Sequence, residues 1–371
     1  MPNETVPELV LAADPDIIDD PVDERLLEDE DTVEENLRYE ITSYGADYDV
    51  EGVVKRLRNG DMKIPDFQRG YVWPIKQASR FIESLLLGLP VPGIFLSNEP
   101  DTNKLLVIDG HQRLTTLRSF YDGIFPSTKK EFSLTDVQQE LIGKTFKTLG
   151  DENRRVLDNA IIHATVVKQT DPKDGGSGIY KIFERLNSSG MLLSPQEIRT
   201  AIYGGSLAKT LSELNANQKW RATFGPVNKR MRDQELILRF LALLANDHKY
   251  KRPMKTFLND FMNEHKQISE TTCKGFATTF NSAINTAHDA LGTKAFKPVS
   301  SFNAAVFDAV LIGIARRLQS GPITDNKDLS QAYKDLISES DFQQWTSRST
   351  ADDDTVKRRL ERARAAFATV R

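Results

Sequence analysis

Two short segments of the sequence carry residue types that can bind phosphate groups. The first is Asp109-Gly-His-Gln-Arg113, which directly follows an apolar, β-branched run. The pattern predicts a strand over 104–108, a tight turn at Gly110 and a helix over about 112–123. Asp109 then lies at the carboxyl end of a strand, and Arg113 falls in the first turn of a helix.

This strand–turn–helix arrangement suits anion chemistry. Unsatisfied N–H groups at a helix start attract anions, and an arginine in the same turn can grip a phosphate through two hydrogen bonds. Asp109 could hold a hydrated Mg²⁺ or position a water molecule. The alternative is structural: Asp109 caps the helix, and Arg113 pairs with a neighbouring acid. These residues alone leave both interpretations open.

The second segment is Ile64-Pro-Asp-Phe-Gln-Arg-Gly-Tyr-Val-Trp-Pro74, which places Gln68 and Arg69 among bulky side chains. We expect Phe67, Tyr71 and Trp73 to belong to the core rather than to a surface that stacks on bases. An unpaired buried guanidinium is costly, so Arg69 needs an anionic partner. Together with Gln112-Arg113, this second Gln-Arg pair suggests that two segments of the chain bind the same polyanion.

Other chemistries find little support in the sequence. Cys273 is the single cysteine, which excludes a disulfide within the chain and a zinc site of several cysteines. The five histidines are scattered without metal-ligand spacing. Gly143-Lys-Thr145 lacks the upstream glycine of a phosphate-binding loop. The longest apolar run, 304–315, contains Asp308 and is too short to span a bilayer, so we expect a cytoplasmic protein without membrane contact.

The charge is divided unevenly along the chain. Residues 1–40 contain 15 acidic residues and two arginines, whereas the remaining 331 residues carry a net charge of +9. The acidic tail lacks apolar surface, so we predict that it is mostly disordered. It serves solubility alone, or it covers a basic surface of the body.

The chain is longer than the roughly 250–300 residues at which a single core stops growing. We predict an acidic tail over 1–40, an α/β domain over 41–204 and an all-helical domain over 205–371. In the α/β domain we expect strands over 94–97, 104–108 and 160–168, and helices over 50–58, 77–87, 112–123 and 179–186, with a further helix starting at Ser194. In the helical domain we expect helices over 234–245, 256–263, 304–318, 326–337 and 355–370.

The last of these helices is basic, because it contains Lys357, Arg358, Arg359 and Arg362. It is either a solvated helix face or a surface that binds DNA or a partner protein.

Together the two motif segments resemble the N-terminal domain of GmrSD-type, modification-dependent restriction systems, a family of the ParB/sulfiredoxin-like superfamily. Residues 64–73 match its Ile-Pro-x-x-Gln-Arg-x-x-x-Trp signature, and residues 109–116 match Asp-Gly-Gln-Gln-Arg-Leu-x-Thr except at His111. The segments 183–194 and 230–243 are similar to two further blocks of the family. The resemblance covers about residues 45–250 and implies an α+β protein: a ParB-like α/β domain followed by helices.

The resemblance implies a nucleoside-triphosphate site with Mg²⁺, built by these loops. Its hydrolytic motif maps onto Asp109, Gln112 and Arg113, with Asp109 as the metal ligand. The implied phosphate-binding residues are Gln68, Arg69, Gly110, His111, Thr115, Asn187 and Ser188. His111 is either a tolerated replacement or a source of pH dependence. No His-Asn-His nuclease motif is visible in the sequence, so a separate nuclease subunit is the expected partner for cutting.

We therefore predict a nucleotide-dependent sensor or regulatory subunit of a bacterial antiphage restriction system, a nucleoside triphosphatase that acts on DNA or on a nuclease partner. One alternative is a ParB-like clamp that binds nucleotide and DNA as a homodimer without turnover. The other alternative is a Mg²⁺-dependent nuclease that uses Asp109.

Overall fold

The computed structural model describes the chain except for residues 1–40, 66–70, 99–102, 170–176 and 187–192. The described residues form two compact units. One comprises residues 41–209 and 258–269, and the other comprises residues 210–257 and 270–371. The first unit is mixed α/β and the second is helical, which confirms the predicted fold class.

A five-stranded sheet forms the centre of the α/β unit, in the order β1-β5-β3-β4-β2. β1 runs antiparallel to β5, β5 parallel to β3, β3 antiparallel to β4, and β4 parallel to β2. The strands are β1 (Ile41–Asp49), β2 (Met62–Lys63), β3 (Ile94–Asn98), β4 (Leu105–Asp109) and β5 (Ile161–Gln169). The three predicted strands are confirmed, whereas β1 and β2 were not expected.

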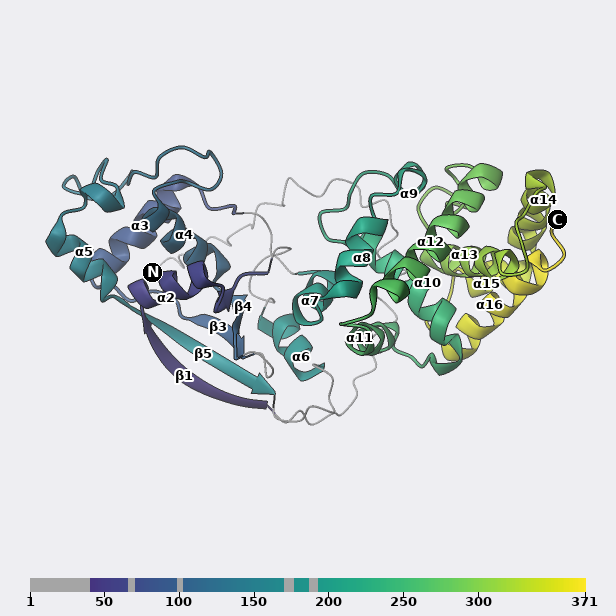
Figure 1. The fold of residues 1–371 in the computed structure, drawn as a ribbon, viewed down its shortest axis with the longest axis horizontal. Coiled ribbons are helices and arrows are strands. Elements are labelled where there is room, and N and C mark those ends of the chain that lie inside the picture. The colour runs from purple at the N-terminus through teal and green to yellow at the C-terminus, as the bar shows by residue number, and fades with distance from the viewer. Residues whose placement is uncertain (1–40, 66–70, 99–102, 170–176, 187–192) are drawn as a thin grey trace, which may run out of the picture. The chain divides into compact units, whose positions relative to one another are not determined.

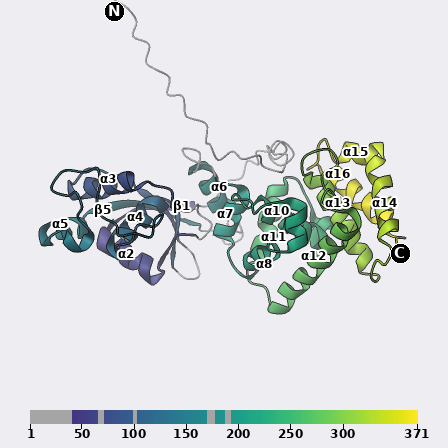
Figure 2. The same cartoon turned by 90° about the horizontal axis from the view of Figure 1, so that it is seen from above.

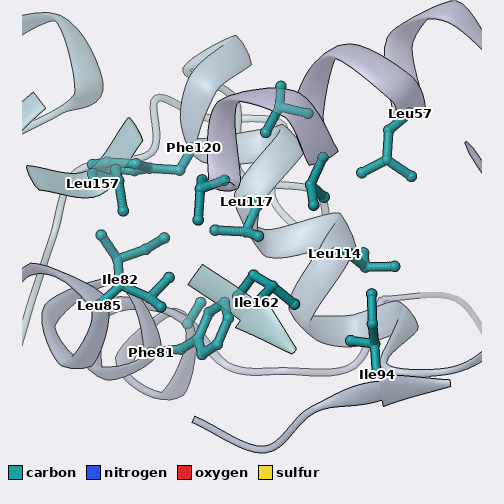
Figure 3. Close-up of a cluster of buried hydrophobic side chains, with 14 of the residues drawn as sticks. Leu57, Phe81, Ile82, Leu85, Ile94, Leu114, Leu117, Phe120, Leu157 and Ile162 are labelled. Carbon is teal, nitrogen blue, oxygen red and sulfur yellow. The ribbon is translucent and has the colours of Figure 1, made fainter. Parts of the chain in front are cut away.

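One face of the sheet is covered by four helices, which lie together in Figure 1. They are α2 (Val50–Asn59), α3 (Ile75–Leu86), α4 (His111–Asp122) and α5 (Asp151–Asp158). Figure 3 shows their apolar side chains, such as Leu117 and Phe120 of α4, meeting Ile82 and Leu85 of α3 and Ile162 of the sheet. This cluster fixes the axis of α4 relative to the strand that precedes it.

The opposite face packs against α6 (Ser177–Leu186) and α7 (Pro195–Ile202). β4 shows the arrangement most clearly, because Leu105 and Val107 face the α2–α5 cluster while Leu106 and Ile108 face α6 and α7. A strand buried on both faces reads as a continuous apolar run, which is why β4 was evident in the sequence. Its last residue, Asp109, is only partly buried.

The helical unit is built around α13 (Ala304–Leu318), whose residues from Ala304 to Ala315 are all buried. The helices that pack on it include α10 (Arg232–Asn246), α12 (Glu270–Leu291) and α16 (Asp353–Phe367), and Figures 1 and 2 show the group. The elements after α7 are α8 (Ser206–Leu214), α9 (Gln218–Phe224), α10 (Arg232–Asn246), α11 (Met254–Glu264), α12 (Glu270–Leu291), α13, α14 (Asn326–Ser338), α15 (Ser340–Trp345) and α16 (Asp353–Phe367). The five predicted helices of this region are confirmed as α10, α11, α13, α14 and α16. The sequence did not predict α5 in the α/β unit. In the region after α7 it did not predict α8, α9, α12 and α15.

Across the residues that the structure describes, no helix is both long and apolar enough to cross a membrane.

Candidate functional site

The turn between β4 and α4 requires glycine for two independent reasons. Gly110 adopts φ +100°, a backbone conformation that side-chain-bearing residues rarely adopt. A Cβ atom at this position would also lie 2.4 Å from Cγ2 of Ile94. Gly110 is the N-cap of α4 and, as a glycine, has no side chain that could cap the helix.

Asp109 and Arg113 form an ion pair at this end of α4. Nη2 of Arg113 donates to Oδ2 of Asp109 at 2.8 Å. The Arg113 side chain is 14% exposed and that of Asp109 is 49% exposed. The structure thus brings the two residues together, and the acid that pairs with Arg113 is Asp109 itself.

Gln112 joins the two motif segments through its amide group. Its Oε1 accepts hydrogen bonds from the backbone N–H groups of Val72, at 3.2 Å, and Trp73, at 3.4 Å. Its Nε2 lies 2.8 Å from Nε2 of His111. Since Oε1 is the acceptor for the backbone, Nε2 donates and the His111 nitrogen accepts. Gln112 therefore holds the backbone that follows Gln68-Arg69 against α4.

Tyr71 makes a second link between the segments. The Thr116 hydroxyl donates to the Gln112 carbonyl oxygen at 2.8 Å, so the Tyr71 hydroxyl donates to Thr116, at 2.7 Å. Burial raises the pKa of Tyr71 to about 12, although the hydrogen bond to Thr116 opposes the rise. Both residues belong to the two motif segments, but their types and spacing alone did not predict this link.

The aromatic residues around this link belong to the core, as predicted for Tyr71 and Trp73. The Tyr71 ring meets Phe125 edge-on at 5.5 Å between centroids, and the Trp73 ring meets Phe81 at 5.7 Å. Both rings pack against the α2–α5 cluster. They therefore anchor the segment after Arg69 rather than present a surface for bases.

The remaining predicted site residues fall into two groups. Gly110, His111 and the partly buried Thr115 lie at or near the start of α4. Gln68, Arg69, Asn187 and Ser188 lie outside the described residues. Within the described part of the chain, no group of three or more His, Cys, Asp or Glu side chains is arranged to hold a metal ion.

Two of the four predicted basic residues of the terminal helix α16 are paired with acids of the protein. Arg359 is fully buried and donates to the carboxylate of Asp308 and to the carbonyl of Thr350. Nε of Arg362 donates to Glu339 at 2.7 Å. Lys357 and Arg358 are exposed. Arg359 is thus a core residue, and only part of the predicted basic face reaches solvent.

Comparison with known families supports the resemblance drawn from the motifs. Residues 50–204 match the family model described as GmrSD restriction endonuclease, N-terminal domain. The match includes both motif segments and ends before the block at 230–243, which the resemblance had included. No curated protein matches the chain in sequence. The match suggests a role in a restriction system, and residues 50–204 are similar to the N-terminal domain of GmrSD restriction endonucleases.

Proposed function

We propose that the chain is a nucleotide-dependent sensor or regulatory subunit of a modification-dependent restriction system, and that it binds triphosphate at the start of α4. The observation that carries the proposal is the glycine-capped first turn of α4, where Arg113 and Asp109 meet at 2.8 Å. Helix N-termini offer N–H groups and a positive dipole end to phosphate oxygens.

Arg113 is held ready for a phosphate in this arrangement. A guanidinium carries five N–H donors, and the bond to Asp109 involves one nitrogen, Nη2. Asp109 fixes the orientation of the guanidinium before a ligand arrives. Preorganised donors are effective because they need not reorient as charge develops in the transition state.

Gln112 links the site at the start of α4 to the segment over 64–74. It binds the backbone of Val72 and Trp73, and Arg69 precedes Val72 by three residues. We propose that Gln68 and Arg69 supply the second set of phosphate contacts. In this role Gln112 holds the segment after Arg69, whereas the resemblance implied that it acts in hydrolysis.

Asp109 is suited to a metal ion that arrives with the nucleotide. In nucleotide sites Mg²⁺ is commonly held by one or two carboxylates together with phosphate oxygens, and a half-exposed aspartate at the helix start fits that donor set. Bound there, Mg²⁺ would offset negative charge on the phosphates. Arg113, and by proposal Arg69, would offset the charge that develops on the transferred phosphoryl group.

The direct test is a hydrolysis panel of the four ribonucleoside triphosphates, with and without modified DNA. We expect Asp109→Ala and Arg113→Ala to abolish phosphate release while the variants remain folded. Asp122→Ala is the matched control, because Asp122 pairs with Arg58 and is 42% exposed at the other end of α4. Full activity in the Asp109 and Arg113 variants, or no turnover by the unaltered chain, would refute the hydrolytic part of the proposal.

The ion pair also favours a second candidate. A carboxylate that is engaged with Arg113 is less available to orient a water molecule, so the site can bind nucleotide without turnover. The chain would then act as a ParB-like nucleotide-gated clamp on DNA. Nucleotide-dependent cross-linking of a homodimer, without phosphate release, would support this candidate over the triphosphatase.

A further inference from the structure

The two edge strands of the sheet differ in how they are protected from pairing with another chain. β2 is two residues long and includes Lys63, whereas β1 is nine residues long and contains no lysine, arginine or proline. β1 also pairs with β5 in one continuous register without a bulge, and Figure 1 shows the two strands side by side. Short strands, lysines, prolines and bulges are the usual protections of a sheet edge, so β1 is an edge that lacks them.

The backbone groups of β1 alternate between β5 and the outer edge. The N–H of Val50 donates to the carbonyl oxygen of Ala160 at 3.0 Å, in the same register that pairs the two strands. Since every second residue of an antiparallel strand bonds to its partner, the even-numbered residues of β1 bond to β5. The residues whose N–H and C=O groups point away from β5 are then Ile41, Ser43, Gly45, Asp47 and Asp49. Gly45, at the centre, is exposed and has no side chain to cover this edge.

Two copies of β1 are complementary when they run antiparallel with their Gly45 residues opposite each other. This register pairs all nine residues of the strand. It places Asp47 opposite Ser43 of the second copy and Asp49 opposite Ile41, so no two like charges face each other. A register with Asp47 opposite its own copy would oppose like charges and leave the strand ends unpaired. The charges of β1 therefore favour full-length pairing with a second copy.

The side chains of β1 suit the same register. Ala46 and Tyr48 pack against the α2–α5 cluster, and Tyr44, on the same face of the strand, is 49% exposed. In a pair centred on Gly45, Tyr44 lies opposite Ala46 of the second copy and diagonal to its Tyr48, an arrangement in which cross-strand aromatic contacts form. Asp47, on the other face, already has a partner, because its Oδ1 lies 2.6 Å from Nδ1 of His163.

We propose that the outer edge of β1 is a dimer interface, at which a second copy of this chain adds its own β1 antiparallel and centred on Gly45. The two sheets then form one continuous sheet, joined by about ten backbone hydrogen bonds, two for each opposed pair of outward-directed residues. Such an interface would serve the clamp candidate, but it does not depend on nucleotide binding. Dimerisation measured without nucleotide therefore tests it separately from the proposed function.

Sedimentation of the full chain over a concentration series, without nucleotide, is the first experiment. We expect a reversible dimer that Ser43→Lys tightens about fivefold and Ser43→Asp weakens about fivefold, because residue 43 of each copy faces Asp47 of the other. Adding Asp47→Asn should remove the gain from Ser43→Lys. Within one strand these two positions lie about 13 Å apart, so this coupling reports a contact between copies. A monomer at every concentration, or a dimer whose affinity ignores residue 43, would overturn the proposal.

Cysteine cross-linking tests the register, in a full chain that also carries Cys273→Ser. Gly45→Cys should form a disulfide-linked dimer, because opposed Cα atoms lie about 5.5 Å apart and a Cβ atom at this position has open space around it. Asp49→Cys is the matched control, since its two copies would lie about 26 Å apart and should not cross-link. Cross-linking through position 49 but not 45 would contradict the proposal. A chain that dimerises only after residues 1–40 are deleted would also contradict it, and would assign the edge to that segment.

Discussion

Two of the sites at which an aspartate meets an arginine differ in their surroundings, and the surroundings give the two sites different roles. At the start of α4, Asp109 is 49% exposed and accepts one hydrogen bond from Arg113. At the centre of the helical unit, Asp308 is fully buried and accepts from both Arg239, at 2.6 Å, and Arg359, at 3.5 Å. The chemical groups are the same, but only the first pair can reach a ligand.

Exposure to solvent explains why the two ion pairs contribute differently to the stability of the protein. An exposed ion pair is screened by water and contributes little to stability, whereas a buried pair cannot lose one partner without leaving an uncompensated charge. Burial by itself would lower the pKa of Arg239, but the carboxylate of Asp308 reverses the effect and raises it. The buried cluster thus holds the helices together, and the exposed pair can exchange protein contacts for ligand contacts.

Removing the buried carboxylate should have the largest effect. Asp308→Ala leaves Arg239 and Arg359 inside the protein without their acid, and we expect a loss of about 3–5 kcal/mol in the free energy of unfolding. Denaturant titration measures this loss. Asp353→Ala is the control, since Asp353 pairs with Lys251 at the surface of the same unit. A loss below about 1 kcal/mol in Asp308→Ala would erase the contrast between the two sites.

The turn that presents the exposed pair should be the next most sensitive position. Gly110→Ala combines an unfavourable φ, at about 1–2 kcal/mol, with a clash against Ile94 that typically costs a further 1–3 kcal/mol. Gly123→Ala is a matched control, because Gly123 has φ +78° but open space around its Cβ position. Thermal unfolding of the two variants separates the clash from the backbone strain. If both variants lose the same free energy of unfolding, the Ile94 side chain moves away from the new Cβ atom without an energetic cost.

Tyr71 should give the α/β unit a measurable pH dependence. Burial raises its pKa from 10.0 to about 12, so the folded state retains the proton longer than the unfolded state does. The resulting stabilisation is complete below pH 10 and is lost as the pH rises towards 12. We expect Tyr71→Phe to cost about 1 kcal/mol at neutral pH, through the lost bond to Thr116, and to show a shallower decline above pH 10. Unfolding titrations between pH 8 and about 11.5 test this, and identical declines would contradict it.

The exposed carboxylate should matter least for stability. We expect Asp109→Ala to change the free energy of unfolding by less than about 1 kcal/mol, because the pair with Arg113 is half in water. The same variant is expected to abolish nucleotide turnover, so the two effects should separate cleanly. A loss of several kcal/mol would mean that the ion pair is structural, as Asp308 is.

Local chemistry explains the elements that could be predicted from the sequence. Ser194 and Glu197 form the expected capping box at the start of α7, with Ser194 N–H donating to the Glu197 carboxylate at 2.6 Å. Gly123 ends α4 with positive φ, as its position suggested. Such signals act within a few residues of one another, so the sequence displays them directly.

The elements that escaped prediction depend on distant contacts. β1 is mostly exposed and lacks an apolar alternation, and its partner β5 lies more than a hundred residues away in sequence. α12 contains Gly275 together with many threonines and asparagines, which are weak helix formers. It is helical because Phe280, Ala283, Ile284 and Ala287 pack into the core of the helical unit. Tertiary packing overrides the local preference in both cases.

The sequence by itself determined the strand, the glycine turn and the helix after it, and the sharp turn at Gly110 brings Asp109 at the end of β4 close to Arg113 in the first turn of α4. Only the tertiary structure decided that Gln112 binds the backbone of the other motif, and that Asp308 and Arg359, 51 residues apart, share the interior. Both outcomes depend on which surfaces become buried against each other. Burial converts one aspartate into part of the core and leaves the other available for chemistry.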